Sequence, residues 1–449
     1  MENGKKVSLI STVLFTVCSI LVLDSFVAPA IIGVSSITVW ILTTVFFFIP
    51  YGLISAELGS TYPDDGGIVS WVSRAFGELP GVLVGWMYWV NTAFWMPAVF
   101  TAFSGWLCLA LFPSLGLVWQ AVIAVTMCWV IVFIGVRGIE LSVLVSNIMA
   151  IIKMAILVIF GLMGIIYGVK NGLANDFSLP CWIPAPGDAV AYFGAIVYNL
   201  LGFELIGSIG SRIENPKRTI PVMTVVAGLA ISFLYCFGTF GVLAAIRAAE
   251  VDEVDGFVYA LRELCSIFGS AQMPVFYVLT VLAISTLVAN MITWCLGSNE
   301  SFQAAGLDRR SAFLSHRHRK RGTSDHLYYV MGAISSALII LNYSLSADAN
   351  DIFWAIFSFA SIVFMLNYLF LFPAAVKLKL TDDTPRPYAV PGGKAGMVVC
   401  STVCFLGVAL ACYGLIDFDV TGYGFWMQLI GVLLTLVVGW LLYRAGKRK

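Results

Sequence analysis

Three ionisable side chains lie inside long apolar segments of the sequence, namely Asp24, Lys153 and Glu204. Placing a charged side chain at the depth of a bilayer costs on the order of 3 kcal/mol or more, so such residues usually face the interior of a helical bundle or a wet cavity. There a carboxylate can bind a cation or exchange a proton, and a lysine can hold or release one. These residues therefore predict ion or proton chemistry inside a membrane.

The residues around the two acids weaken a helix. Pro29 follows Asp24 by five positions, and a proline removes a backbone donor and disfavours the helical conformation in the residue before it. Glu204 stands between Gly202 and Gly207, which have low helix propensity. We therefore predict two helices that are broken within the membrane, each with an acid at the break. In secondary transporters such breaks hold substrate and coupling ions.

The composition is that of a polytopic membrane protein. Of 449 residues, 60% are hydrophobic and 11% are charged, whereas a soluble chain is about half apolar and about a quarter charged. We expect an all-α protein, because a helix satisfies its backbone polar groups within its own segment. The apolar runs predict about twelve transmembrane helices, near residues 7–32, 36–59, 81–111, 116–136, 143–169, 189–211, 221–246, 272–297, 326–346, 351–373, 397–417 and 424–443.

The charged residues outside these segments are distributed unevenly. The net charge of +0 says nothing about partners, and for a membrane transporter we expect no nucleic-acid partner. Basic residues concentrate on one predicted side, in the loop Ser298–Asp325 and the tail Arg444–Lys449, and acids such as Glu250 and Asp255 on the other. By the positive-inside rule, both termini are predicted to be cytoplasmic in the cell membrane. The basic loop could contact anionic lipid or could serve only to set the topology.

The two acids also indicate an internal repeat. Glu204 follows Asp24 by 180 residues and by five predicted spans. An odd number of spans gives the two halves opposite topology, as an inverted repeat requires. We predict one transmembrane domain over residues 1–449, with repeats at about 7–169 and 189–373 and appended helices at about 397–443.

Cysteine and histidine give little sign of a metal site. The 10 cysteines form no CxxC pair, and 3 histidines are too few for a metal cluster, so we expect no metal and no cofactor. Cys181 and Cys265 both fall in predicted outer loops, and the sequence leaves open whether they form a disulfide.

Four motifs resemble those of the amino acid–polyamine–organocation (APC) superfamily of transporters, and they occur in the expected order. They are Phe46–Pro50 with Ser55–Leu58 and Tyr62–Val72; Gly202–Glu204 with Glu214–Pro221; Trp294–Gly297 with Gln303–Ala305; and Arg386–Gly393. The glutamate/GABA antiporter and polyamine permease branches are the most similar. The resemblance implies a LeuT-like fold, in which spans 1–5 and 6–10 form a 5+5 inverted repeat with broken helices 1 and 6, followed by two C-terminal helices.

One departure from the family pattern bears on the substrate. Many amino acid members have a GSGxxxxP sequence at the first break, and its bare amides receive the substrate carboxylate at a half-helix N-terminus. Aligned on Pro29, this chain has Val22, Leu23 and Asp24 at those positions. A carboxylate there would repel a substrate carboxylate and attract an ammonium group.

The resemblance implies a set of site residues around the two breaks. Tyr198 matches an aromatic gate of the arginine/agmatine exchanger branch, Trp294 matches an aromatic residue near its substrate, and Lys153 stands in for the sodium ion of sodium-coupled members. Each has a structural alternative: a hydrogen-bonded acid for Asp24 and Glu204, a strut for Lys153, and core packing for the aromatics. The expected substrate-binding residues are Asp24, Ser25, Ala28, Tyr198, Gly202, Glu204, Ser208 and Trp294, and the coupling residues are Lys153, Glu204 and Asp24.

We therefore expect a secondary transporter for amino acids, amines or polyamines that works by alternating access, as a proton-coupled symporter or antiporter. The sequence contains no ATP-binding loop and no nucleophile–base constellation, so we expect no enzyme. A uniporter, a sodium symporter, a nutrient sensor and a channel are the alternatives, and Lys153 argues against sodium. The sequence does not specify the substrate, the exchange partner or the oligomeric state.

Overall fold

The fold is helical, as the sequence predicts. The computed structural model describes residues 6–319, 321–344, 349–416, 418–419 and 423–446, and in these residues extended pairing is limited to one isolated bridge between Val7 and Ile213. The α-helices are α1 (Leu9–Ile20), α2 (Ser35–Thr43), α3 (Ile49–Thr61), α4 (Ile68–Phe76), α5 (Glu78–Leu111), α6 (Leu117–Arg137), α7 (Ile139–Asn171), α8 (Pro186–Asn199), α9 (Pro216–Ala245), α10 (Gly256–Leu264), α11 (Gln272–Ala304), α12 (Asp325–Ser344), α13 (Ala349–Thr381), α14 (Gly393–Leu415) and α15 (Tyr423–Gly446). The shorter turns are η1 (Ala28–Ile32), η2 (Thr44–Phe48), η3 (Leu179–Trp182), η4 (Phe203–Arg212), η5 (Ala248–Glu250), η6 (Cys265–Ala271) and η7 (Asp308–Arg310).

Eleven helical stretches of the described chain are long and apolar enough to cross a membrane. The remaining predicted span is the first one, which is divided between the 12-residue α1 and the short η1. The sequence therefore predicted the spans well, but it missed two features at their ends. Helices α11 and α13 continue to Ala304 and Thr381, beyond the predicted ends at 297 and 373, and α10 forms in a predicted outer loop.

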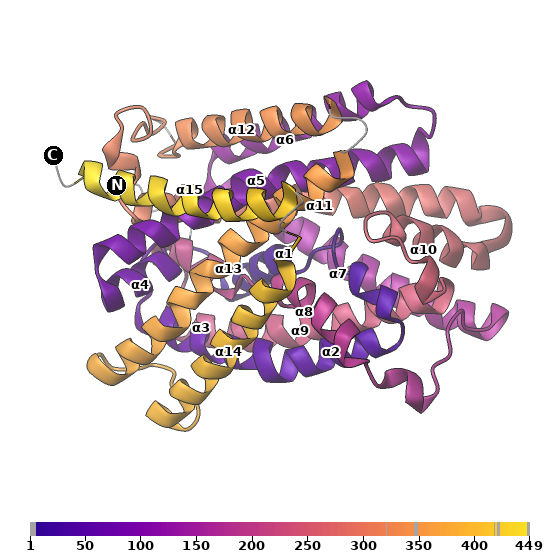
Figure 1. Cartoon of the computed structure of the whole chain (residues 1–449), viewed down its shortest axis with the longest axis horizontal. Coiled ribbons are helices and arrows are strands. Elements are labelled where there is room, and N and C mark those ends of the chain that lie inside the picture. The colour runs from indigo at the N-terminus through magenta and orange to yellow at the C-terminus, as the bar shows by residue number, and fades with distance from the viewer. Residues whose placement is uncertain (1–5, 320, 345–348, 417, 420–422, 447–449) are drawn as a thin grey trace.

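The two broken segments lie at the centre of the bundle. Of the apolar window in residues 192–212, 89% is buried, against 17% for the last span, residues 424–445. The second half of α1 is also buried, and the helix packs on α7, α9 and α11. Figure 1 shows α1 near the middle of the molecule, with α12 along its upper edge. The interrupted helices are therefore enclosed by continuous ones, which shield their unpaired backbone groups from lipid.

The ends of the helices form two distinct faces. In Figure 1, the start of α12 and the ends of α13 and α15 lie at the left end of the molecule, whereas α10 lies towards the right. The left end thus contains the basic loop before α12, and the right end contains the acidic segment that precedes α10.

A wide turn before α3 sets the direction of one side chain of the site. Residues 44–48 form the π-helical turn η2, directly before Pro50 in the first turn of α3. Proline supplies no N–H to the preceding turn, and a π turn is a usual way to accommodate such an interruption. After this turn Tyr51 is fully buried towards the bundle centre, whereas Phe46 is 62% exposed on the outer surface.

Candidate functional site at the helix breaks

The first break begins where α1 ends at Ile20. Leu21 has extended backbone angles (φ −75°, ψ 109°), and the chain does not resume a helical turn until Ala28. Pro29 stands at the start of that turn, as the sequence predicted. The last carbonyls of α1 therefore have no helical partners and must be satisfied by other parts of the protein.

Lys153 satisfies two of these carbonyls. Its side chain extends from α7, is fully buried, and donates from Nζ to the carbonyl oxygens of Cys18 (3.1 Å) and Leu21. Lys153 is also close enough to Asp24 to interact with it electrostatically. An ammonium group thus lies against the broken end of α1, within electrostatic range of the first acid.

Side chains of α9 and α11 also bond to carbonyls of the α1 end, and they share the Cys18 carbonyl with Lys153. Asn290 Nδ2 donates to Cys18 O (2.8 Å) and Ser19 O (3.1 Å), and Trp294 Nε1 donates to Ser19 O (2.9 Å). Tyr235 donates to Ile20 O (2.7 Å). Sequence reasoning missed Asn290 and Tyr235, although an asparagine inside an apolar span is a recognisable signal of an internal polar contact.

The second break separates α8 from η4. Gly202 has φ 131°, a backbone conformation that favours glycine, and a Cβ atom there would lie 3.3 Å from the Trp294 ring. The N–H groups of Gly202 and Phe203 both donate to the Tyr51 hydroxyl, at 3.1 and 2.9 Å. A tyrosine side chain thus caps the start of η4.

Glu204 lies just beyond this cap, in a cage of tyrosine hydroxyls. The Tyr88 and Tyr368 hydroxyls each donate to Glu204 Oε1 at 2.7 Å, and the Tyr51 hydroxyl donates to Oε2. The residue is 2% exposed. Because α3, α5 and α13 each contribute one tyrosine, Glu204 connects three helices to the second break.

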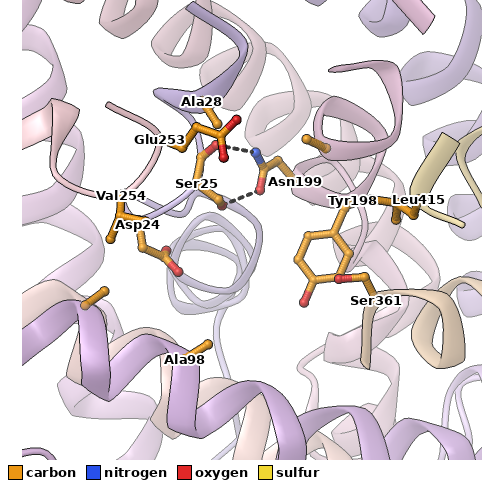
Figure 2. A pocket seen from close by; sticks show the side chains of 12 residues that line it. Asp24, Ser25, Ala28, Ala98, Tyr198, Asn199, Glu253, Val254, Ser361 and Leu415 are labelled. Atoms are coloured by element: carbon orange, nitrogen blue, oxygen red, sulfur yellow. Dashed lines mark hydrogen bonds between the residues drawn. The ribbon is translucent and has the colours of Figure 1, made fainter. Parts of the chain in front are cut away.

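The two breaks are bonded directly to each other. Ser25 Oγ donates to Asn199 Oδ1 (2.7 Å), and Asn199 Nδ2 donates to Ser25 O (3.3 Å), as the dashed lines in Figure 2 show. The N–H of Val22 donates to the Tyr235 hydroxyl (3.0 Å), which also lies 3.1 Å from Asn199 O. A movement of one break would therefore strain the other.

A cavity of about 70 Å³ lies beside these contacts (Figure 2). Asp24 faces it from the first break, and Tyr198 and Ser361 line the opposite side in the view of Figure 2. Among the described residues that line it, two are carboxylates and none is a lysine or an arginine, so the cavity favours a cation. Its lining residues are Asp24, Ser25, Ala28, Ala98, Ala102, Ala195, Tyr198, Asn199, Glu253, Val254, Ser361 and Leu415.

The structure brings some of the predicted site residues together and separates others. Asp24, Ser25, Ala28 and Tyr198 line the cavity. Trp294 lines a smaller adjoining space, which shares Tyr198 and Asn199 with the cavity. Gly202, Glu204 and Ser208 line neither space in this conformation.

The predicted aromatic residues belong to a larger cluster. The ring of Trp294 lies 5.7 Å from Trp95 and 5.1 Å from Phe364, and the ring of Tyr198 lies 6.0 Å from Trp95 and 5.6 Å from Phe364. Trp95 and Phe364 were not predicted as site residues. The cluster separates the cavity from the Tyr88 and Glu204 contacts of the second break, because Tyr88 packs on Trp294 at 5.8 Å.

Two of the sequence motifs meet beneath the second break. Gly67 has φ 49°, and a Cβ atom there would lie 2.7 Å from the carbonyl oxygen of Glu204, so only glycine allows this approach. Asp65 accepts hydrogen bonds from the N–H (2.9 Å) and the hydroxyl (2.7 Å) of Ser211. Val7 N–H donates to Arg212 O at 2.8 Å, which attaches the chain before α1 to the end of η4.

Two further motifs meet at the same end of the bundle. Glu57 is fully buried and accepts from Lys379 Nζ (2.8 Å) and the Val390 N–H (2.7 Å). Nearby, hydrogen bonds from Thr384 and Tyr62 lower the pKa of Asp382 to about 2, so this carboxylate stays ionised well below neutral pH. These contacts hold α3 and the end of α13 together at this end of the protein, whereas the cavity lies towards the loop before α10.

The structure bears on two further sequence predictions, one about a metal site and one about a disulfide. His316 and His326 come together with Asp325, although histidine was considered too scarce for a cluster. Their rings stack 4.2 Å apart at 16°, so their in-plane lone pairs do not converge, and we assign no metal there. Cys181 and Cys265 are both free thiols, and Cys265 is fully buried.

A helical membrane bundle with two central helices broken beside a cavity that two acidic side chains line is the architecture of a secondary transporter. The chain belongs to the amino acid permease family, whose family model matches residues 7–437. This confirms the resemblance inferred from the motifs, and the protein is a multi-pass membrane transporter.

The similar proteins differ in the substrates that their names give. The chain is 32% identical over 396 residues to a probable agmatine/putrescine antiporter of Lactococcus lactis subsp. lactis, covering 87% of this chain and 84% of that protein. It is 23% identical over 400 residues to a probable polyamine transporter of Arabidopsis thaliana, covering 86% and 74%. It is 22% identical over 437 residues to an aspartate/glutamate permease of Lactococcus lactis subsp. cremoris, covering 90% and 87%.

Proposed function

We propose that this chain is a secondary active transporter of amines or polyamines that works by alternating access with proton coupling, by symport or exchange. The observation that carries the proposal is the Asp24 carboxylate in a cavity whose described lining includes no lysine or arginine. Lys153 interacts with Asp24 from outside this lining, and in a site of low dielectric a substrate ammonium group would also be attracted to the carboxylate, whereas a substrate carboxylate would be repelled by it. The names of the agmatine/putrescine and polyamine relatives support an amine, and the aspartate/glutamate permease keeps an amino acid as the alternative.

Aromatic and polar groups would complete the substrate site. The Tyr198 ring lines the cavity opposite Asp24, and an aromatic face attracts a desolvated cation by about 2 kcal/mol. Ser25, Ala28 and Asn199 form the wall between the two breaks. Trp294, Gly202 and Ser208 would contact substrate only after the aromatic cluster rearranges, because they lie outside the cavity in this conformation.

Lys153 and Glu204 are the proposed coupling residues. The Lys153 ammonium bonds to the carbonyl oxygens of Cys18 and Leu21. A coupling metal cation would need such carbonyl oxygens as ligands, and Lys153 already occupies them. A proton is therefore the proposed coupling ion, and replacing sodium by choline in the uptake buffer should leave transport unchanged. Glu204 would exchange a proton when its three tyrosine contacts open and close.

The proposal includes an orientation in the cell membrane. With both termini cytoplasmic, the closed end that contains Glu57 and Asp382 faces the cytoplasm, and the cavity lies towards the outside. Residues about 7–169 and 189–373 would form the inverted repeats of a single domain, and helices α14 and α15 would be the appended pair.

The test is the variant Asp24→Asn, assayed in proteoliposomes for competition by putrescine and by its α-carboxylated parent amino acid, ornithine. We expect wild type to bind putrescine more tightly. The affinity of the variant for putrescine should be lower by about tenfold or more, equivalent to about 1.4 kcal/mol or more of binding free energy, and its affinity for ornithine should fall less. Asp176→Asn is the control, since Asp176 is an exposed loop acid that bonds to Ser178. Equal losses for both ligands, or none, would make Asp24 a structural residue.

A further inference from the structure

We propose that Glu253 is the second carboxylate of the substrate site and that it selects ligands with a second cationic group. This inference rests on the proposed amine-binding role of the cavity and assigns to it a residue that the sequence indicated only as an outer-loop acid. Asp24 and Glu253 come from segments that are far apart in the chain, yet both side chains line the same cavity (Figure 2).

The loop that contains Glu253 is held in place by hydrogen bonds and by packing on neighbouring elements. The Val254 carbonyl accepts a hydrogen bond from Trp106 Nε1 of α5 (2.9 Å), and Asp252 Oδ1 accepts from the Val254 N–H (2.9 Å). The Ala248 N–H donates to Asn175 Oδ1 (2.9 Å), and the η5 turn packs on η1 of the first break. Glu253 is therefore positioned over the break by bonds on both sides of it.

The Glu253 side chain differs from its neighbour Glu250 in its surroundings. Tyr192 donates to Glu253 Oε1 at 3.2 Å, and the half-buried Glu253 side chain lines the cavity. Glu250 is paired with Arg247 in the same loop, with 53% of its side chain exposed, and it does not line the cavity. The two glutamates thus have the same side chain, but Glu253 lines the cavity and Glu250 lies on the surface, so Glu250 is a matched control for Glu253.

The chemistry of the cavity wall fits a hydrocarbon chain between two charges. Ala28, Ala98, Ala102 and Ala195 present methyl groups to the space that Asp24 and Glu253 also line. Methylene groups pack against methyl groups without loss of hydrogen bonds, whereas each carboxylate needs a cation when water is excluded. The fitting ligand is therefore a linear molecule with a cationic group at each end.

A ligand with only one cationic group would satisfy only one acid. When the outer side closes, Glu253 would remain with only the Tyr192 hydroxyl and no cation from the ligand, which disfavours the closed complex. Glu253 should thus act on selectivity between dications and monocations rather than on amine binding in general.

The experiment compares putrescine with n-butylamine, which has the same carbon chain but only one ammonium group. Their half-inhibitory concentrations against labelled putrescine are measured in proteoliposomes containing wild type, Glu253→Gln or Glu250→Gln. We expect Glu253→Gln to weaken the binding of putrescine about tenfold and to leave the binding of n-butylamine unchanged or slightly stronger. Glu250→Gln should retain the wild-type ratio.

One result would overturn the inference, namely a putrescine/butylamine ratio that is the same in Glu253→Gln as in Glu250→Gln. If the ratio is unchanged because both amines lose affinity equally in Glu253→Gln, the residue would have a role in access instead. If wild type binds neither amine, the proposed function fails as well, whereas amine binding with an unchanged ratio removes only the role of Glu253.

Discussion

At the scale of single residues, the most informative side chain is Lys153. It reaches the end of α1 from the middle of α7 and bonds to two carbonyls that the break leaves without helical partners. Asn290 supports the same helix end from α11, so removal of the ammonium group would leave the Cys18 carbonyl partly satisfied and the Leu21 carbonyl without its lysine donor. Asn290 also supplies hydrogen bonds to this helix end, but it carries no charge, so the positive charge is the contribution of Lys153 that Asn290 does not replace.

We predict that Lys153→Ala abolishes proton-driven accumulation of substrate, because the cation between α1 and α7 is lost. The measurement is uptake into proteoliposomes with an imposed pH gradient, over a range of external pH. Lys170→Ala is the control: this lysine lies at the exposed end of the same helix and donates to Ile267 O. Uptake of unchanged magnitude and pH profile in Lys153→Ala would make Lys153 a structural strut.

At the scale of helices, the second break depends on tyrosines from three different elements. Tyr51 follows the π turn η2, and its hydroxyl contacts both the exposed N–H groups at the start of η4 and the carboxyl group of Glu204. One hydroxyl group thus joins α3 to the break, and no other described side chain donates to Glu204 Oε2.

We predict that Tyr51→Phe destabilises the protein by about 1–3 kcal/mol, the cost of leaving buried polar groups unsatisfied. The melting temperature of the detergent-purified variant should fall, and transport should fall with it. Tyr413→Phe is the matched control, because Tyr413 is 58% exposed on α14. Identical melting temperatures for the two variants would show that the Tyr51 hydroxyl does not stabilise the break.

The sequence predicted the helices and the breaks because both depend on local patterns. Apolar length identifies a span, and Pro29 beside Asp24 or the glycines around Glu204 identify an interruption. The extensions of α11 and α13 were missed because they leave the apolar region, where hydropathy no longer distinguishes helix from loop. The nine-residue α10 was missed because a short amphipathic segment between two spans resembles a loop.

The partners at the breaks could not be predicted because they depend on contacts between distant segments. The chain has 17 tyrosines, and nothing near Tyr51, Tyr88 or Tyr368 in the sequence indicates that all three reach Glu204. Glu253 was visible only as one of several outer acids. Its position at the cavity follows from the packing of its loop on η1 and α5, which no local pattern contains.

At the scale of the whole molecule, the basic residues lie at the same end as the contacts that join the segments opposite the cavity. The basic loop before α12 and the basic end of α15 lie at the left end of Figure 1, where the end of α13 also lies. That end is closed by the contacts of Val7 with Arg212 and of Glu57 with Lys379. The cavity lies near the opposite, acidic loop, so the positive-inside rule predicts that the cavity faces away from the cytoplasm.

We predict that the basic loop is inaccessible from outside an intact cell. A cysteine introduced by Arg319→Cys, in a Cys181→Ser background, should react with an impermeant maleimide only after permeabilisation. Ile183→Cys in the same background is the control, because Ile183 is 75% exposed in the segment before α8, on the predicted outer side, and should react on intact cells. Cys181→Ser removes the native thiol of that loop, and the thiol of Cys265 is fully buried. Labelling of Arg319→Cys without permeabilisation, with none at Ile183→Cys, would reverse the orientation and would direct the cavity and Glu253 towards the cytoplasm.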